Sequence, residues 1–90
     1  MDRVIPIEVK ESDAVQTLFT SYNSYIDLIT ILSQNGINKD VLNDQFEKAK
    51  DVNTKLSMLK EALRYKYQPK DEDFNNYSFD FHNHTMVFQK

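Results

Sequence analysis

The sequence predicts a mainly α-helical α+β fold: an antiparallel hairpin of two long helices, with a short N-terminal strand and a C-terminal β-hairpin. Three observations indicate this fold. Two long segments each carry a heptad-like apolar repeat, a lone glycine lies between them, and aromatic residues alternate in the tail. A chain of 90 residues without cysteine predicts a single domain (1–90) that no disulfide stabilises. We therefore expect the helical hairpin, a self-association interface, or both to supply the stability.

Residues 4–10 are expected to form a short strand. Ile5, Ile7 and Val9 alternate with proline or charged residues, and this period of two gives the strand one apolar face. Pro6 lacks the N–H group that a central strand needs on both sides. The strand is therefore expected at the edge of a sheet.

The first helix is expected over residues 12–35, with Ser12 as its N-cap. Apolar residues recur at alternating steps of three and four, and further apolar residues lie beside them, so the stripe widens toward the end of the helix. One facing helix is too narrow to cover such a stripe. The stripe is the predicted protein interface, and it consists of Leu18, Phe19, Tyr22, Tyr25, Ile26, Leu28, Ile29, Ile31 and Leu32.

The segment after this helix predicts a tight turn. Gly36 suits the left-handed position that ends a helix, and Ile37 suits the apolar contact that follows it. Asn38 is the expected N-cap of a second helix over residues 38–67, which Pro69 ends. Because the connection is short, the two helices are expected to be antiparallel neighbours.

The tail is expected to contain a polar linker over residues 68–75 and a β-hairpin over residues 76–90. A two-residue turn at Asn83 and His84 would pair four apolar residues on one face: Phe81 with Met86, and Phe79 with Phe88. The N-terminal strand could join this hairpin to make a small sheet. The same tail residues, Phe79, Phe81, Met86 and Phe88, are candidates for strand addition to a neighbouring subunit.

No motif predicts catalysis, a cofactor or a small-molecule substrate. The lone glycine is used in the turn, so no phosphate-binding loop is expected. His82 and His84 have a spacing found in metal sites, but no further ligand is indicated, so we interpret them as turn residues. Asp27 is expected to face outward or to pair with a lysine or arginine across an interface. Four tyrosines are interpreted as core or interface residues: Tyr22, Tyr25, Tyr65 and Tyr67.

Charge and hydropathy narrow the choice of partners. The net charge of −3 is spread over mixed acidic and basic residues, so no nucleic-acid partner is expected. The strongly apolar run over residues 25–32 is far shorter than the ~20 residues that span a bilayer. No signal peptide precedes the first strand, so the expected location is the cytoplasm or a particle assembled in the cytoplasm.

These observations favour a non-catalytic structural or adaptor subunit that associates with itself or with a larger protein assembly. A phage particle is one such assembly, suggested only by analogy of architecture. The alternative is a small acidic regulator or inhibitor that binds one partner protein and masks it. A hairpin that binds nucleic acid through the lysines of the second helix is a third hypothesis, and its affinity would fall steeply with salt.

Overall fold

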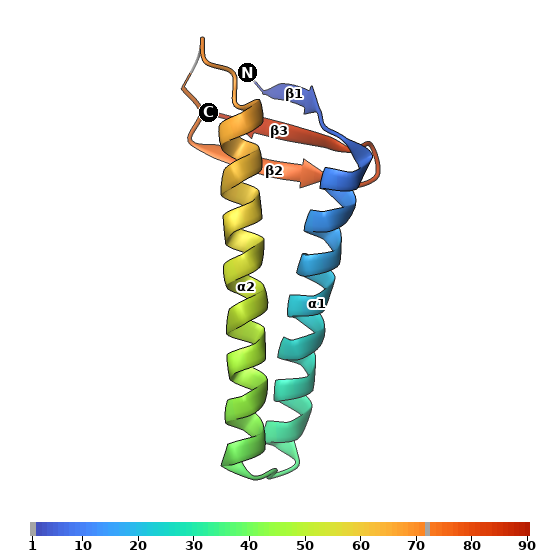
Figure 1. Ribbon diagram of the computed structural model, residues 1–90, viewed down its shortest axis with the longest axis vertical. Helices are drawn as coiled ribbons and strands as arrows, with labels where there is room; N and C mark the ends of the chain where they lie inside the picture. Colours follow the sequence, from blue (N-terminus) through green and yellow to red (C-terminus); the bar gives the residue numbers. More distant parts are fainter. Residues whose placement is uncertain (1, 72) are drawn as a thin grey trace.

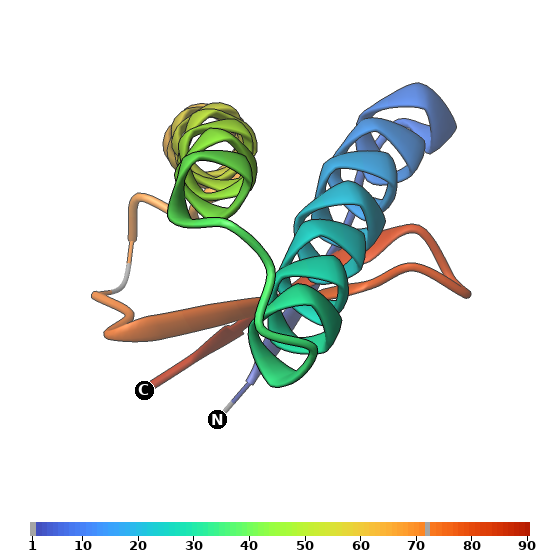
Figure 2. The same ribbon diagram turned by 90° about the horizontal axis from the view of Figure 1, so that it is seen from below.

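The structure is a computed structural model that describes residues 2–71 and 73–90. Its elements in chain order are β1 (Arg3–Pro6), α1 (Val9–Gln34), α2 (Lys39–Tyr67), β2 (Asn76–Asp80) and β3 (Thr85–Gln89). The two helices pack side by side, and the sheet lies across the open end of their hairpin (Figure 1). Both helices lie on the same face of the sheet (Figure 2). The predicted fold class is therefore confirmed.

The turn between the helices forms as predicted. Gly36 has a φ of +67°, in the left-handed region that an L side chain rarely adopts. The Ile37 N–H donates to the Leu32 carbonyl oxygen at 3.2 Å, which is the long hydrogen bond of the expected motif. The Asn38 side chain caps α2 by accepting a hydrogen bond of 2.7 Å from the Asp40 N–H.

The start of α1 differs from the prediction. The helix begins at Val9, three residues earlier than expected, so the first strand is shorter and Val9 is not part of it. Glu8 is the N-cap, and the Glu11 carboxylate accepts a 3.0 Å hydrogen bond from the Glu8 N–H. In this capping box the Glu8 side chain in turn accepts from the Glu11 backbone, so both residues satisfy backbone donors at the helix start. Ser12 is therefore not the cap, and its side chain is buried inside the helix packing.

The strands form an antiparallel sheet in the order β1-β3-β2. β1 joins the tail hairpin and occupies an edge, as Pro6 predicted. The predicted turn and pairing of the tail are wrong by two residues, because Phe79 lies opposite Met86 and the loop spans residues 81–84. Since a shift of two residues preserves the face of every side chain, Phe79, Met86 and Phe88 still share one face.

Asp80 gives the physical reason for the longer loop. Its carboxylate accepts backbone hydrogen bonds from His82 at 3.0 Å and from Asn83 at 3.1 Å. Aspartate side chains commonly close a local turn in this way. His84 then completes the loop with a φ of +53°.

The main core lies at the open end of the hairpin, between the helices and the sheet. It is a cluster of buried residues from both helices and β3: Val15, Leu56, Leu63, Met86 and Phe88. Ile29 and Ala49 are also buried, but they lie outside this cluster. The described residues extend over 52 × 23 × 19 Å. Hydrophobic stabilisation is thus concentrated at the end that carries the sheet.

Candidate protein-interaction surfaces

The predicted interface on α1 divides into a covered and an exposed part. Five of its nine residues are buried or half-buried: Leu18, Tyr22, Tyr25, Ile29 and Leu32. The other four are exposed: Phe19, Ile26, Leu28 and Ile31. The covered set follows the alternating spacing of three and four, as expected for residues that pack against α2.

The four exposed residues lie on two different sides of α1. Phe19 and Ile26 are seven residues apart, which places them on one side of the helix. Leu28 follows Phe19 by nine residues, or about two and a half helical turns, so it lies on the opposite side. Ile31 follows Leu28 by three residues and shares its side. The predicted interface is therefore two surfaces, and one flat partner cannot cover both.

One exposed surface lies around the turn that closes the hairpin. We call it the closed-end patch, and it consists of Leu28, Ile31, Ile37 and Val41. Leu28 and Ile31 keep 40% and 54% of their surface accessible to solvent. Charged Asp27, Lys39 and Asp40 adjoin these residues in the sequence and are exposed. An apolar centre with a charged rim is typical of protein-interaction surfaces.

The other exposed surface is a groove between the hairpin and the sheet, which Phe19 lines but Ile26 does not. We call it the open-end groove, and it is lined by Val15, Phe19, Leu56, Lys60, Tyr77, Ser78, Phe79 and Phe81. Its volume is about 270 Å³. The aromatic side chains of the tail form one contact network, with the Phe79 and Phe81 rings stacked at 6.1 Å between centroids and Tyr77 edge-on to Phe79 at 5.9 Å. This packing fixes the shape of the sheet side of the groove.

The tail residues predicted for strand addition pack within their own chain. Met86 and Phe88 are fully buried in the core cluster, and Phe79 and Phe81 pack against it. These side chains stabilise the junction of sheet and helices. β3 is paired on both sides, so addition of β3 to a neighbouring subunit would require Met86 and Phe88 to leave the core.

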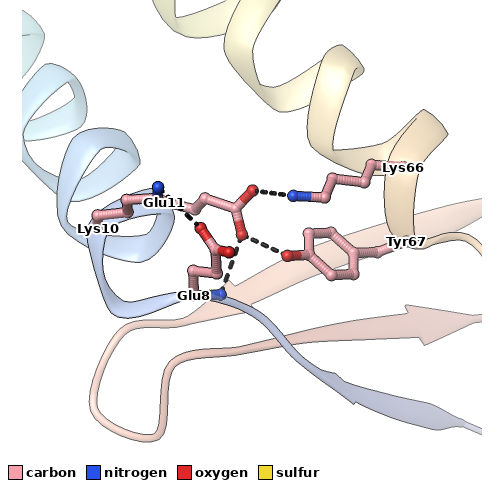
Figure 3. Close-up of polar contacts among 5 residues, drawn as sticks. All are labelled: Glu8, Lys10, Glu11, Lys66 and Tyr67. Carbon is pink, nitrogen blue, oxygen red and sulfur yellow. Dashed lines mark hydrogen bonds and ion pairs between the residues drawn. The ribbon is translucent and has the colours of Figure 1, made fainter.

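A polar cluster joins the two helices at the open end of the hairpin (Figure 3). Glu11 of α1 accepts hydrogen bonds from two residues in the last turn of α2: from Lys66 Nζ at 2.8 Å and from the Tyr67 hydroxyl. Together with the bond from the Glu8 N–H, these contacts occupy both carboxylate oxygens of Glu11. We call this cluster the Glu11 clasp.

The clasp shifts the pKa values of its members in opposite directions. Burial raises the pKa of Glu11, but the hydrogen bonds from Lys66, Tyr67 and Glu8 outweigh burial, so the pKa of Glu11 is lowered. The hydrogen bond to Glu11 raises the pKa of Lys66. The same carboxylate, followed by burial, raises the pKa of Tyr67. All three shifts favour a negative carboxylate facing an ammonium group and a protonated phenol.

The histidines of the tail lie in the loop between β2 and β3. His82 is exposed, and the backbone carbonyl of His84 accepts a hydrogen bond from the Ile7 N–H at 3.0 Å. The hydrogen bonds from Asn83, followed by that from His82, lower the pKa of Asp80. Across residues 2–71 and 73–90, no three histidine or acidic side chains are arranged to hold a metal ion. The loop is organised by Asp80 as a turn.

The remaining predicted positions are found on the surface or in the clasp. Asp27 is exposed, as expected. Tyr65 is exposed, whereas Tyr67 points its hydroxyl to Glu11, so these two tyrosines do not form one stacking platform. Within the described part of the chain, no helix is long and apolar enough to cross a membrane.

Sequence reasoning missed two residues that shape these surfaces. Glu11 was not singled out, although its spacing of three from Glu8 is the signal of a reciprocal helix cap. Tyr77 lines the open-end groove, and its alternation with Phe79 was a signal for the same strand face. The contact between the sheet and the helices had no local signal, because it joins residues far apart in the sequence.

Comparisons of this chain with models of protein families, with curated protein sequences and with solved structures found no match.

Proposed function

We propose that this chain is a non-catalytic structural or adaptor subunit that associates with a copy of itself, or with a larger protein assembly, through the closed-end patch. The observation that supports this proposal most is the exposure of Leu28 and Ile31, at 40% and 54%. Neither α2 nor the sheet covers them. Single exposed apolar residues are ordinary on protein surfaces. Two on one side of a helix, near a turn where Ile37 and Val41 are also exposed, are the kind of group that marks an interaction site.

The shape of the hairpin favours a simple mode of association. Two hairpins that pack side by side through this part of α1 would form a four-helix bundle. Such an isologous contact uses the same patch on both copies and closes at a dimer. A head-to-tail contact would instead build a ring or filament, as a repetitive particle requires.

Light scattering over a wide range of concentrations tests this proposal. The unaltered chain is expected to be a dimer or a larger species, and the double variant Leu28→Gln, Ile31→Gln is expected to be a monomer. Met58→Gln is the matched control, since Met58 is an exposed apolar residue on α2 outside the patch. A monomer at every concentration would contradict self-association and favour the alternative of a small acidic regulator.

A further inference from the structure

The two edges of the sheet can be compared through their backbone hydrogen bonds. In an antiparallel ladder, successive residues direct both of their backbone groups to opposite sides of the strand. The Ile7 N–H donates to the His84 carbonyl oxygen at 3.0 Å, so alternate residues of β3 counted from His84 face β1. The residues between them, Thr85, Val87 and Gln89, therefore face β2. The bond from the Asn75 N–H to the Gln89 carbonyl oxygen at 3.2 Å agrees with this assignment.

The register of β2 then identifies its free backbone groups. Thr85, Val87 and Gln89 lie opposite three residues of β2: Asp80, Ser78 and Asn76. Those three residues direct their N–H and carbonyl groups toward β3. Tyr77 and Phe79 direct their N–H and carbonyl groups to the outer edge of β2, and no strand of the described chain pairs with that edge.

The opposite edge of the sheet, on β1, is protected. Its outward residues are Val4 and Pro6, because the pairing of Ile5 with Met86 is directed inward. Pro6 has no N–H to donate, which is a common way to block strand addition. β2 carries no proline, and two of its four outward groups are N–H donors. The β2 edge is thus the better template for another strand.

The open-end groove lies directly against this free edge. β2 is the strand nearest to the closed end of the hairpin, so a strand added beside it would run across the two helices (Figure 1). Tyr77 and Phe79 face the groove, and Phe19 lines its helix side with 48% of its surface exposed. Alternate side chains of an added strand would point into this apolar groove.

Lys60 gives the groove a charge preference. Its Nζ lies 6.0 Å from the centroid of the Tyr77 ring, and its charge also attracts the neighbouring Glu61 carboxylate. Lys60 is the one charged side chain among the groove residues described above. An acidic residue of a bound segment would complement it at the rim.

A second copy of this chain does not fit as the added strand. Antiparallel pairing of β2 with its own copy would place the two-fold axis perpendicular to the sheet, so both hairpins would lie on the same face. Each hairpin runs past the β2 edge, and the two would occupy the same space (Figures 1 and 2). A single extended segment lacks a helical layer and meets no such obstacle.

We propose that the β2 edge and the open-end groove bind an extended peptide segment of another protein by strand addition. The segment has apolar side chains at alternate positions, which enter the groove, and an acidic residue that meets Lys60. Main-chain hydrogen bonds to Tyr77 and Phe79 provide affinity, and the groove provides selectivity. This surface is separate from the closed-end patch.

Selection of a displayed library of random linear peptides on the full chain tests the proposal. The selected peptides are expected to alternate apolar residues and to carry an acidic residue. Amide exchange by NMR then distinguishes strand addition from other binding: the Tyr77 and Phe79 amides are expected to exchange at least tenfold more slowly with a selected peptide bound. Selection of no binding peptide, or a bound peptide that leaves both amides fast, would overturn the proposal.

Matched variants locate the peptide on the groove. Phe19→Ala and Lys60→Glu are each expected to weaken binding of the selected peptide about tenfold. Phe46→Ala and Lys50→Glu are the controls, since both residues are exposed on α2 and neither lines the groove. Equal loss in a variant and its control would overturn the assignment. Leu28→Gln combined with Ile31→Gln is expected to leave the peptide affinity unchanged.

Discussion

The Glu11 carboxylate and the Lys66 ammonium group join the first turn of α1 to the last turn of α2, with 2.8 Å between Oε2 and Nζ. The contact spans 55 residues of sequence. It holds the open end of the hairpin together beside the sheet, so replacement of Glu11 should lower the stability of the whole fold.

Replacement Glu11→Gln is expected to lower the free energy of unfolding by about 1–3 kcal/mol, because hydrogen bonds to a charged group are lost and their partners remain. Urea denaturation measures the change. Glu47→Gln is the control, since Glu47 is an exposed carboxylate on α2, and it is expected to change stability by less than about 0.5 kcal/mol. Equal effects of the two variants would show that the clasp does not stabilise the fold.

The clasp also predicts a dependence of stability on pH. Because folding lowers the pKa of Glu11, the folded chain binds this proton less readily than the unfolded chain does. The contribution of Glu11 is therefore complete above the usual glutamate pKa of about 4.3, and it is lost as pH falls through the lower pKa of the folded chain. Urea denaturation of the unaltered chain and of Glu11→Gln should be compared between neutral and acidic pH. The difference between their free energies of unfolding is expected to shrink below that pH. A constant difference would contradict the assignment.

Gly36→Val is expected to destabilise the chain by about 1–2 kcal/mol, since a side chain with φ near +67° is strained. No atom outside its neighbours lies within 4 Å of an added Cβ, so the cost comes from the backbone alone. Gly36→Asn should cost less, because asparagine tolerates the left-handed region. Thermal unfolding of the two variants compares them, and equal costs would argue against strain as the cause.

Ile29 and Ile31 are expected to respond differently to the same replacement. Ile29 is buried, so Ile29→Asp places a charge without a partner between the helices and should lower stability by several kcal/mol. Ile31 is exposed, so Ile31→Asp should change stability by less than about 1 kcal/mol when measured on the monomer. Comparable unfolding by both variants would mean that Ile31 is covered within the single chain.

The sequence predicted the features that depend on neighbouring residues. Gly36, Ile37 and Asn38 indicated the turn, and the alternation of Phe79 with its neighbours indicated the correct strand face. It predicted less well where two local signals competed. Ser12 is a good N-cap by residue type, but the pair of Glu8 and Glu11 begins the helix earlier. The hairpin register also depended on the side chain of Asp80, which closes a longer loop than a residue pair alone would suggest.

The candidate surfaces were predicted only in part. The exposure of Leu28 and Ile31 follows from a stripe wider than one partner helix. The separation of Phe19 from Leu28 onto opposite sides could also be calculated from helical spacing. The open-end groove could not be predicted, because it forms only when the sheet folds back onto the helices and brings Phe79 close to Phe19. No local pattern encodes that distance.

The uneven distribution of the core has a consequence for motion. The cluster around Phe88 anchors the end with the sheet, whereas Ile29 and Ala49 are the buried apolar residues of the described chain that lie outside it. Regions with few buried apolar contacts open with a smaller free energy than the whole domain does. The helical turns at the closed end of the hairpin should therefore unfold locally first, while the end that carries the sheet stays folded.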